Sequence, residues 1–134
     1  MNRTVAERAL AWTSIVSGAL LWILESLHGV LYGGTPQSLI IDFIAASLLL
    51  YAGIQSLRQG AEGAAGLLFG AWAYAFCDAY RAIWWRAEVY YGSRQVDMTE
   101  PYAVFAMLSA AGLLTIACFA TSFVLAHPRP GRVS

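Results

Sequence analysis

The carboxyl group of Glu25 and the imidazole of His28 lie three residues apart within LLWILESLHGVLY, one of the most apolar stretches of the chain. Residues at this spacing share one face of a helix. An acid and an imidazole on one face can pass a proton, bind a cation or pair with each other. If the stretch crosses a membrane, a charge within it costs ~2.5–3.5 kcal/mol, so Glu25 needs a partner or a function.

Three more charged residues interrupt apolar stretches, namely Asp42, Asp78 and Arg81. Asp78 and Arg81 are separated by three positions, so they can neutralise each other on their own helix. Arg81 can also extend toward a membrane surface along its aliphatic stem. Asp42 follows a predicted helix start, where the helix dipole favours an acid. Each residue thus has a structural explanation beside a role in binding a ligand or a proton, and Glu25 is the hardest to explain structurally.

Metal and enzyme signatures are sparse. Glu25-x-x-His28 has the form of half a di-iron motif, which requires a second such pair and two further glutamates. The other histidine, His127, lies at the far end of the chain, so one chain offers neither a di-metal site nor two histidines for a haem. A single metal ion or a pigment at His28 stays open, and we assign no metal ligand and no cofactor. No nucleophile elbow, His-Glu-x-x-His motif, phosphate loop or Cys-x-x-Cys pair marks the chain as an enzyme.

The composition predicts an all-α, polytopic integral membrane protein in contact with a lipid bilayer. Hydrophobic residues make up 59% of the 134 positions and charged residues 12%, about half of the ~25% that is usual in soluble domains. The mean hydropathy is +0.58. The formal net charge is zero, which leaves no basic surface for nucleic acid.

Four apolar stretches have the length of ~20 residues that a bilayer requires. They predict a single four-helix transmembrane domain over residues 1–134, with spans at about 7–32, 38–57, 64–91 and 101–126. Gly33, Gly34 and Pro36 predict a tight turn after the first span. Thr99-Glu100-Pro101 has the composition of a capped helix start, with Glu100 at the positive end of the fourth helix dipole.

The arginines predict the orientation of the bundle, because cytoplasmic loops carry an excess of positive charge. Five of the eight lie near the termini or after the second span, so we expect both termini in the cytoplasm: Arg3, Arg8, Arg58, Arg129 and Arg132. The chain uses arginine without lysine, which fits a GC-rich bacterial genome and hence a bacterial inner membrane. Cys77 and Cys118 fall at different depths, so we expect no disulfide between them.

The charged residues then fall at one level. At ~1.5 Å per residue, Glu25 lies about 10 Å and His28 about 6 Å inward from the outer end of the first span. Asp42, Asp78 and Arg81 fall in the same outer half, while the inner half is almost purely apolar. These five residues from three helices predict a shared polar pocket that opens outward.

Two small-residue pairs allow helices to approach closely, Ser14-x-x-x-Gly18 and Gly66-x-x-x-Gly70. Packing within the bundle and association with a second copy explain such pairs equally well.

Three functions fit this pocket. The first is binding or transport of a small molecule or ion by a homo-oligomer, with Glu25 as the coupling carboxylate. The second is an accessory or structural subunit of a larger membrane complex, with the aromatic third span as its docking surface. The third is a small membrane enzyme acting on a lipid-like substrate. A four-span chain of this size with one glutamate in its first span resembles the small multidrug resistance transporters in architecture, although their flanking motifs do not occur around Glu25.

Overall fold

The computed structural model describes residues 3–33, 35–59, 61–92 and 100–127 and contains four α-helices in these ranges. They are α1 (Arg3–Tyr32), α2 (Pro36–Gln59), α3 (Ala61–Tyr90) and α4 (Tyr102–Ala126). The expected all-α, four-helix architecture is therefore confirmed. Gly33 has a φ of 68°, in the left-handed region that glycine adopts without strain, and it ends α1 where a turn was predicted.

Three of the four helices are long and apolar enough to cross a membrane, over Val5–Tyr32, Pro36–Arg58 and Tyr102–Ala126. They indicate an integral membrane protein that contacts lipid. Among the described residues, α3 does not meet this criterion of apolarity. Its second half carries four charged side chains, Asp78, Arg81, Arg86 and Glu88.

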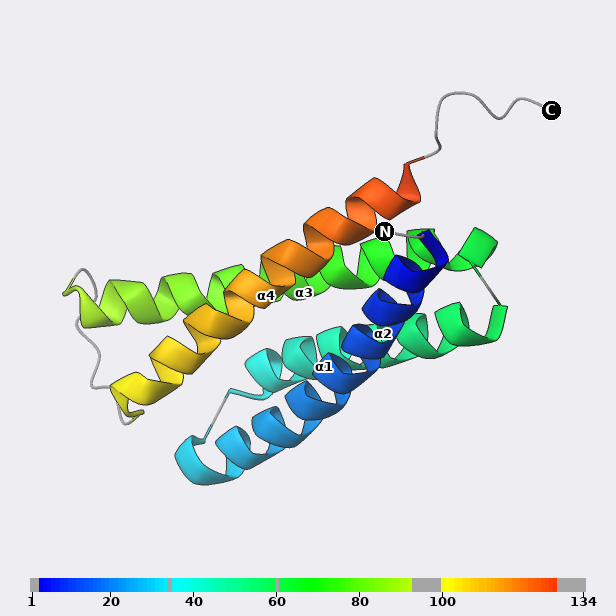
Figure 1. Cartoon of the computed structure of the whole chain (residues 1–134). Helices are drawn as coiled ribbons and strands as arrows, with labels where there is room; N and C mark the ends of the chain where they lie inside the picture. The colour runs from blue at the N-terminus through cyan, green and yellow to red at the C-terminus, as the bar shows by residue number, and fades with distance from the viewer. Residues whose placement is uncertain (1–2, 34, 60, 93–99, 128–134) are drawn as a thin grey trace.

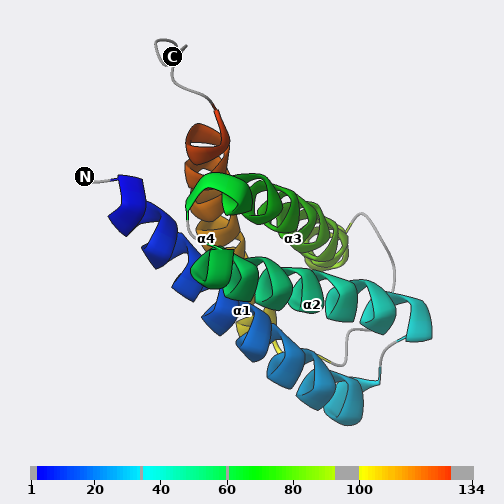
Figure 2. The same cartoon turned by 90° about the vertical axis from the view of Figure 1, so that its right-hand side faces the viewer.

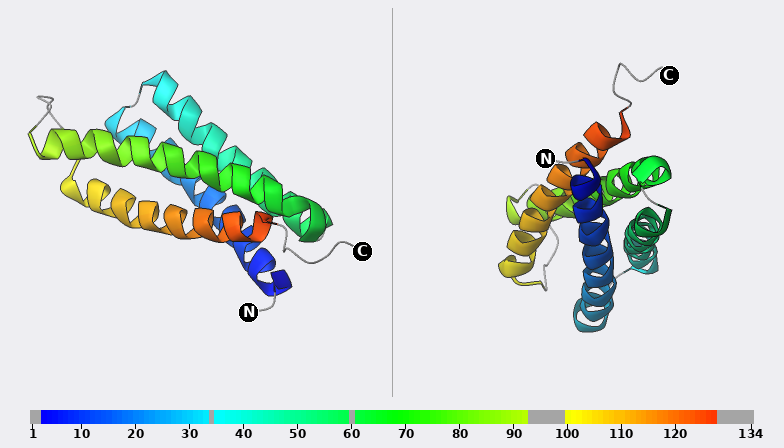
Figure 3. Two further views of the ribbon diagram at one scale, coloured as in Figure 1. Left: turned by 90° about the horizontal axis from the view of Figure 1, so that it is seen from above. Right: turned by 45° about the vertical axis from the view of Figure 1, so that its right-hand side comes forward.

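The helices form two antiparallel pairs, α1 with α2 and α3 with α4, and the pairs are joined by packing of α2 against α3 (Figure 1). Both chain termini lie at the same end of the bundle, which we call the terminal end. We call the opposite end, where α1 and α3 finish and α2 and α4 begin, the polar end. Views from two other directions show α1 crossing the bundle at an angle to α3 and α4 (Figures 2 and 3).

Two glycines allow α1 and α2 to pack backbone against backbone. A Cβ atom on Gly18 would lie 2.7 Å from the carbonyl oxygen of Ala46, and one on Gly53 would lie 2.7 Å from that of Ala11. The Ser14-x-x-x-Gly18 pair thus serves packing inside the chain. A Cβ atom on Gly66 or Gly70 would meet nothing within 4 Å, so this second pair has no such use within one copy.

The apolar core lies toward the terminal end and is centred on Trp72 of α3, which is fully buried. The indole Nε1 of Trp72 donates a 2.8 Å hydrogen bond to Ser14 Oγ, and Ser14 Oγ donates one of 2.8 Å to the carbonyl oxygen of Leu10. This arrangement gives the buried indole N–H the partner that it needs. All four helices contribute to the surrounding cluster, which includes Leu10, Leu49, Leu68, Cys118 and Leu125.

Aromatic rings connect α3 to α4. Phe69 and Phe76 both stack on Phe119, with ring centroids 5.4 and 5.6 Å apart. A Cβ atom on Gly112 would lie 2.5 Å from Cδ1 of Ile83, so α4 also approaches α3 closely at this point. Cys77 is exposed and Cys118 buried, and both are free thiols, as expected from their different depths.

The start of α4 differs from the expectation. Pro101 occupies the N-cap position with an extended backbone, and among the described residues no side-chain hydrogen bond caps the helix. The predicted capping role of Glu100 is therefore wrong, because its carboxylate binds groups on α1 and α3 instead. Thr99, the other residue of the predicted cap, lies outside the described residues.

Candidate functional site

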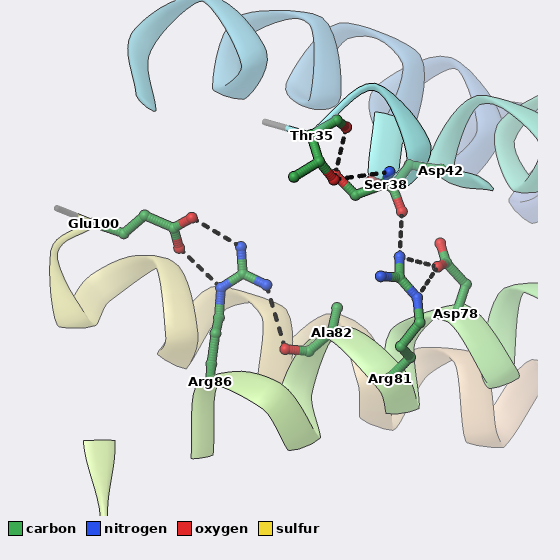
Figure 4. A network of polar contacts seen from close by, with 8 residues as sticks. All are labelled: Thr35, Ser38, Asp42, Asp78, Arg81, Ala82, Arg86 and Glu100. Carbon is green, nitrogen blue, oxygen red and sulfur yellow. Dashed lines mark hydrogen bonds and ion pairs between the residues drawn. The ribbon is translucent and has the colours of Figure 1, made fainter. Parts of the chain in front are cut away.

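Arg81 links two acidic residues from different helices at the polar end. Its Nη2 donates to Asp78 Oδ1 over 2.8 Å and its Nε donates to the same oxygen over 3.3 Å. The same Nη2 donates to Asp42 Oδ1 over 3.2 Å. Figure 4 shows the guanidinium of α3 between the two carboxylates, one from its own helix and one from α2. The pairing expected along α3 is present, and it extends to α2.

The first turn of α2 places Asp42 at this level. Ser38 N donates to Thr35 Oγ1 over 3.3 Å, and Ser38 Oγ donates to the carbonyl oxygen of Thr35 over 2.9 Å. These local bonds satisfy backbone groups at the helix start, as Ser and Thr commonly do. Asp42 then lies in the second turn, whereas the helix dipole acts mainly within the first turn, which carries no acid, so the expected dipole contribution to Asp42 is small.

A second ionic group joins α1, α3 and the start of α4. His28 Nε2 lies 2.7 Å from Glu100 Oε1. Arg86 donates to both oxygens of the same carboxylate, from Nε to Oε2 over 2.8 Å and from Nη2 to Oε1 over 3.1 Å. Arg86 also donates to the carbonyl oxygen of Ala82 over 3.3 Å, and Tyr90 OH donates to that of Glu100 over 3.1 Å (Figure 4 shows the arginine bonds).

Glu25 lies between these two ionic groups. Its carboxyl group is close to that of Asp42 and within electrostatic range of His28, Arg86 and Asp78. His28, the partner that the sequence offered for Glu25, makes its hydrogen bond to Glu100, and Arg81 makes its bonds to Asp42 and Asp78. Glu25 is thus surrounded by charged groups whose strongest contacts are already made.

The sequence did not identify Arg86 and Glu100 as members of this site. Both are largely buried, with side chains 12% and 11% exposed. Arg86 lies on α3 one turn beyond Arg81, which was the available signal, while Glu100 resembled a helix cap. We refer to the combined set of seven residues as the polar-end cluster: Glu25, His28, Asp42, Asp78, Arg81, Arg86 and Glu100.

The polar-end cluster contains more acid than base. Four carboxyl groups face two guanidinium groups, which leaves an excess of two negative charges when His28 is neutral. Asp42, Asp78 and Glu100 are largely buried, with side chains 13%, 9% and 11% exposed. Uncompensated charge in such surroundings is costly. The arrangement therefore favours the uptake of protons or of another positive charge.

Glu100, which precedes the last predicted span, shows how the Arg86 guanidinium affects the pKa of a neighbouring acid. Its burial raises the pKa of the carboxyl group, but hydrogen bonds from Arg86 and His28 and the charges of both lower it by more. The pKa of Glu100 consequently lies below its ordinary value of 4.5. Glu100 is therefore a stable anion that holds Arg86 and His28 in place.

Metal binding has little geometric support in the described part of the chain, where no three His, Cys, Asp or Glu side chains converge so as to hold an ion. The buried acids of the cluster are oriented toward guanidinium groups.

No protein-family model matches the chain. No curated protein and no solved structure matches it either. The geometry of the polar-end cluster is therefore the basis for its proposed function.

Near the cluster, the exposed side of α3 carries aromatic residues. Tyr80 and Trp84 stack with ring centroids 5.9 Å apart, and Trp84 Nε1 donates to Glu88 Oε1 over 2.7 Å. Tyr90 lies on another side, where it contacts Tyr102 at 5.2 Å. Tyr80 and Trp84 thus face outward, whereas Tyr90 packs against Tyr102 of α4.

Proposed function

We propose that this chain is a small four-span membrane protein that binds and transports a small cation or a proton as a homo-oligomer. The observation that supports this most directly is that Asp42 and Asp78, from two helices, share the guanidinium of Arg81 while the carboxyl group of Glu25, from a third helix, lies near Asp42. One guanidinium cannot neutralise three carboxylates. A proton or a bound cation supplies the missing positive charge, and its exchange provides the basis for transport.

Glu25 is the coupling residue in this proposal. Asp78 and Asp42 both accept hydrogen bonds from Arg81, and Glu100 accepts them from Arg86, so each of these three acids has a guanidinium partner. The carboxyl group of Glu25 approaches an acid, Asp42, and has no guanidinium of its own among the described hydrogen bonds. It is consequently the acid whose charge state responds most readily to an added cation.

In the proposed topology α3 crosses the bilayer as well as the three more apolar helices, and both termini face the cytoplasm of a bacterial inner membrane. The packing of α3 against α2 on one side and α4 on the other supports this, because two apolar spans then shield much of its polar surface. Arg8 and Arg58 lie toward the terminal end, in agreement with a positive cytoplasmic side. The polar-end cluster would open to the opposite face.

The exposed face of α3, on the side away from the other helices, supports the homo-oligomer. Gly66, Gly70 and Cys77 are exposed there, and both glycines leave room for a neighbouring backbone. Farther along the same face, the Arg81 side chain is 46% exposed and the Trp84 side is exposed too. A partially exposed guanidinium facing lipid is unfavourable, so contact with a second copy would stabilise it.

A flux assay tests the transport function. Purified protein is reconstituted into liposomes, and an inwardly directed gradient of protons or of a monovalent cation is applied. Proton uptake is followed with an enclosed pH-sensitive dye, and cation uptake is followed by radioactivity. We expect wild-type protein and the control Glu88→Gln to conduct flux and Glu25→Gln to lose at least tenfold. Glu88 is a suitable control because it is an acid on the outer side of α3, bonded to Trp84. Equal flux through Glu25→Gln and wild type would refute the proposed role of Glu25.

A subunit of a larger membrane complex is the second candidate. The exposed aromatic side chains Tyr80, Trp84 and Tyr91 near the polar end favour it, because aromatic residues and arginine are enriched in protein interfaces. Native mass spectrometry of protein extracted gently from its own membrane separates the two candidates. A homo-oligomer supports transport by this chain, and constant recovery with a different protein supports the subunit function.

A further inference from the structure

The α1–α2 pair is held together along its length. Close backbone contacts at Gly18 and Gly53 join its middle and its terminal end. Toward the polar end, the rings of Trp22 and Phe43 lie 4.3 Å apart, and Trp22 Nε1 donates to Ser47 Oγ over 3.3 Å. These contacts make α1 and α2 a single packed unit.

The α3–α4 pair is held together in the same way. Phe69 and Phe76 stack on Phe119 toward its terminal half. At the polar end, Tyr90 contacts Phe105 at 5.3 Å and Arg86 binds Glu100 just before α4. The second pair is therefore also a packed unit over its whole length.

Contacts between the two pairs differ at the two ends. At the terminal end, all four helices share the apolar core, and the buried Trp72–Ser14 hydrogen bond crosses from α3 to α1. At the polar end, the described side-chain hydrogen bonds Arg81–Asp42 and His28–Glu100 join the two pairs. Within the described residues, every ring–ring contact joins residues of the same pair.

We propose that the two pairs separate at the polar end by pivoting about the core around Trp72. The core is closely packed and contains the buried Trp72–Ser14 hydrogen bond, which would be costly to break in lipid because no water is there to replace it. The two ionic links are discrete and depend on charge, so water or a bound cation can replace them. The Arg81 side chain is 46% exposed, so one of these links lies at the surface of the single chain.

Opening of this kind would expose Glu25, which lies on α1 near residues of both links. The inference goes beyond the proposed function, because it concerns relative movement of the helices and applies whether the chain transports a cation or serves in a complex. It assigns Asp42 and Glu100 as latch residues that control access to Glu25.

Distance measurements between spin labels test the pivot without any ligand. The background carries Cys77→Ser and Cys118→Ala. One labelled pair, Val30→Cys with Met107→Cys, reports on the polar end. A second pair, Trp12→Cys with Val124→Cys, reports on the terminal end. All four label positions are exposed, so the labels cause little disturbance of packing.

Each labelled pair is measured in lipid nanodiscs with and without Asp42→Asn and Glu100→Gln together. We expect these changes to lengthen and broaden the polar-end distance by several ångströms and to leave the terminal-end distance unchanged. The control Glu88→Gln, which removes one carboxylate outside the two links, should change neither distance, because Glu88 accepts a hydrogen bond from Trp84 of the same helix.

Two results would overturn the pivot. One is a polar-end distance that stays the same when both latch residues are changed. The other is an equal lengthening at both ends, which would mean general loss of packing. If the double variant does not fold, Asp42→Asn and Glu100→Gln are measured separately and judged by the same criteria, each breaking one link. Because no ligand is present, failure here leaves the flux assay of Glu25→Gln a separate test.

Discussion

His28 Nε2 on α1 lies 2.7 Å from Oε1 of Glu100, the residue 72 positions later that precedes α4. Glu100 in turn accepts two hydrogen bonds from Arg86 of α3. One carboxylate thus connects three helices at the polar end. Its position explains how an acid beside a helix start contributes to the arrangement of the bundle.

Acid should weaken this connection. The pKa of Glu100 lies below its usual value in the folded protein, because the effects of Arg86 and His28 exceed that of burial. An acid with a lowered folded pKa contributes stability that is present above its unfolded pKa and is lost as pH falls through the folded pKa. We expect the melting temperature in detergent to decrease as the pH is lowered past about 4.5. We expect Glu100→Gln to flatten this acidic part of the plot of melting temperature against pH. An identical acid profile in wild type and Glu100→Gln would contradict this.

Asp78 should matter more for stability than Asp42. Arg81 donates twice to Asp78, which is the more buried of the two acids, and once, over a longer distance, to Asp42. Hydrogen bonds to charged groups contribute about 1.5–3 kcal/mol. We expect Asp78→Asn to lower unfolding stability by about that amount and Asp42→Asn by less, as measured by chemical denaturation in mixed micelles. A larger loss for Asp42→Asn would mean that Arg81 is held chiefly from α2.

The two small-residue pairs should respond differently to alanine. In Gly18→Ala the new methyl group would meet the Ala46 carbonyl at 2.7 Å, so α1 must move away from α2 and the protein loses stability. In Gly66→Ala the methyl group enters open space, and the helix gains up to about 1 kcal/mol from alanine's higher propensity. Thermal unfolding of both variants, measured at a high ratio of detergent to protein, checks this. Equal destabilisation would show that Gly66 is packed within the chain.

Self-association through α3 should be detectable through the natural cysteine. Cys77 is exposed on the face that carries Gly66 and Gly70, whereas Cys118 is buried. Oxidation in native membranes should therefore give a covalent dimer that Cys77→Ser abolishes and Cys118→Ala leaves intact. Gly70→Leu should reduce the yield severalfold. A dimer that persists in Cys77→Ser, or a yield that Gly70→Leu leaves unchanged, would place the contact elsewhere.

The number and type of helices followed from the sequence, because long apolar stretches interrupted by glycine and proline leave few alternatives. It also followed that Asp42, Asp78 and Arg81 lie at the same end of the bundle, since helix rise fixes the position of a residue along its helix. Their partners did not follow. Whether Glu25 or Glu100 faces His28 depends on the rotation and crossing of α1 and α4, which residue spacing within one helix does not determine.

For Glu100 and for the glycines of the two small-residue pairs, too, the sequence did not predict the tertiary partner. An acid before a helix is favoured by the dipole, so Glu100 resembled a cap until Arg86 was seen to bind it. Ser14-x-x-x-Gly18 and Gly66-x-x-x-Gly70 have the same pattern, yet α2 covers only the first. Local sequence specifies that a helix surface permits close approach and leaves the identity of the neighbour to the tertiary structure.

The measurement that tests the central claim most directly is charge displacement on a solid-supported membrane. Proteoliposomes receive a rapid jump in pH or in monovalent cation concentration, and the transient current is integrated. Uptake of positive charge at the polar-end cluster predicts a transient in wild type and Glu88→Gln that Glu25→Gln abolishes. A transient of equal size in wild type and Glu25→Gln, or none in wild type under any of these jumps, would contradict the claim.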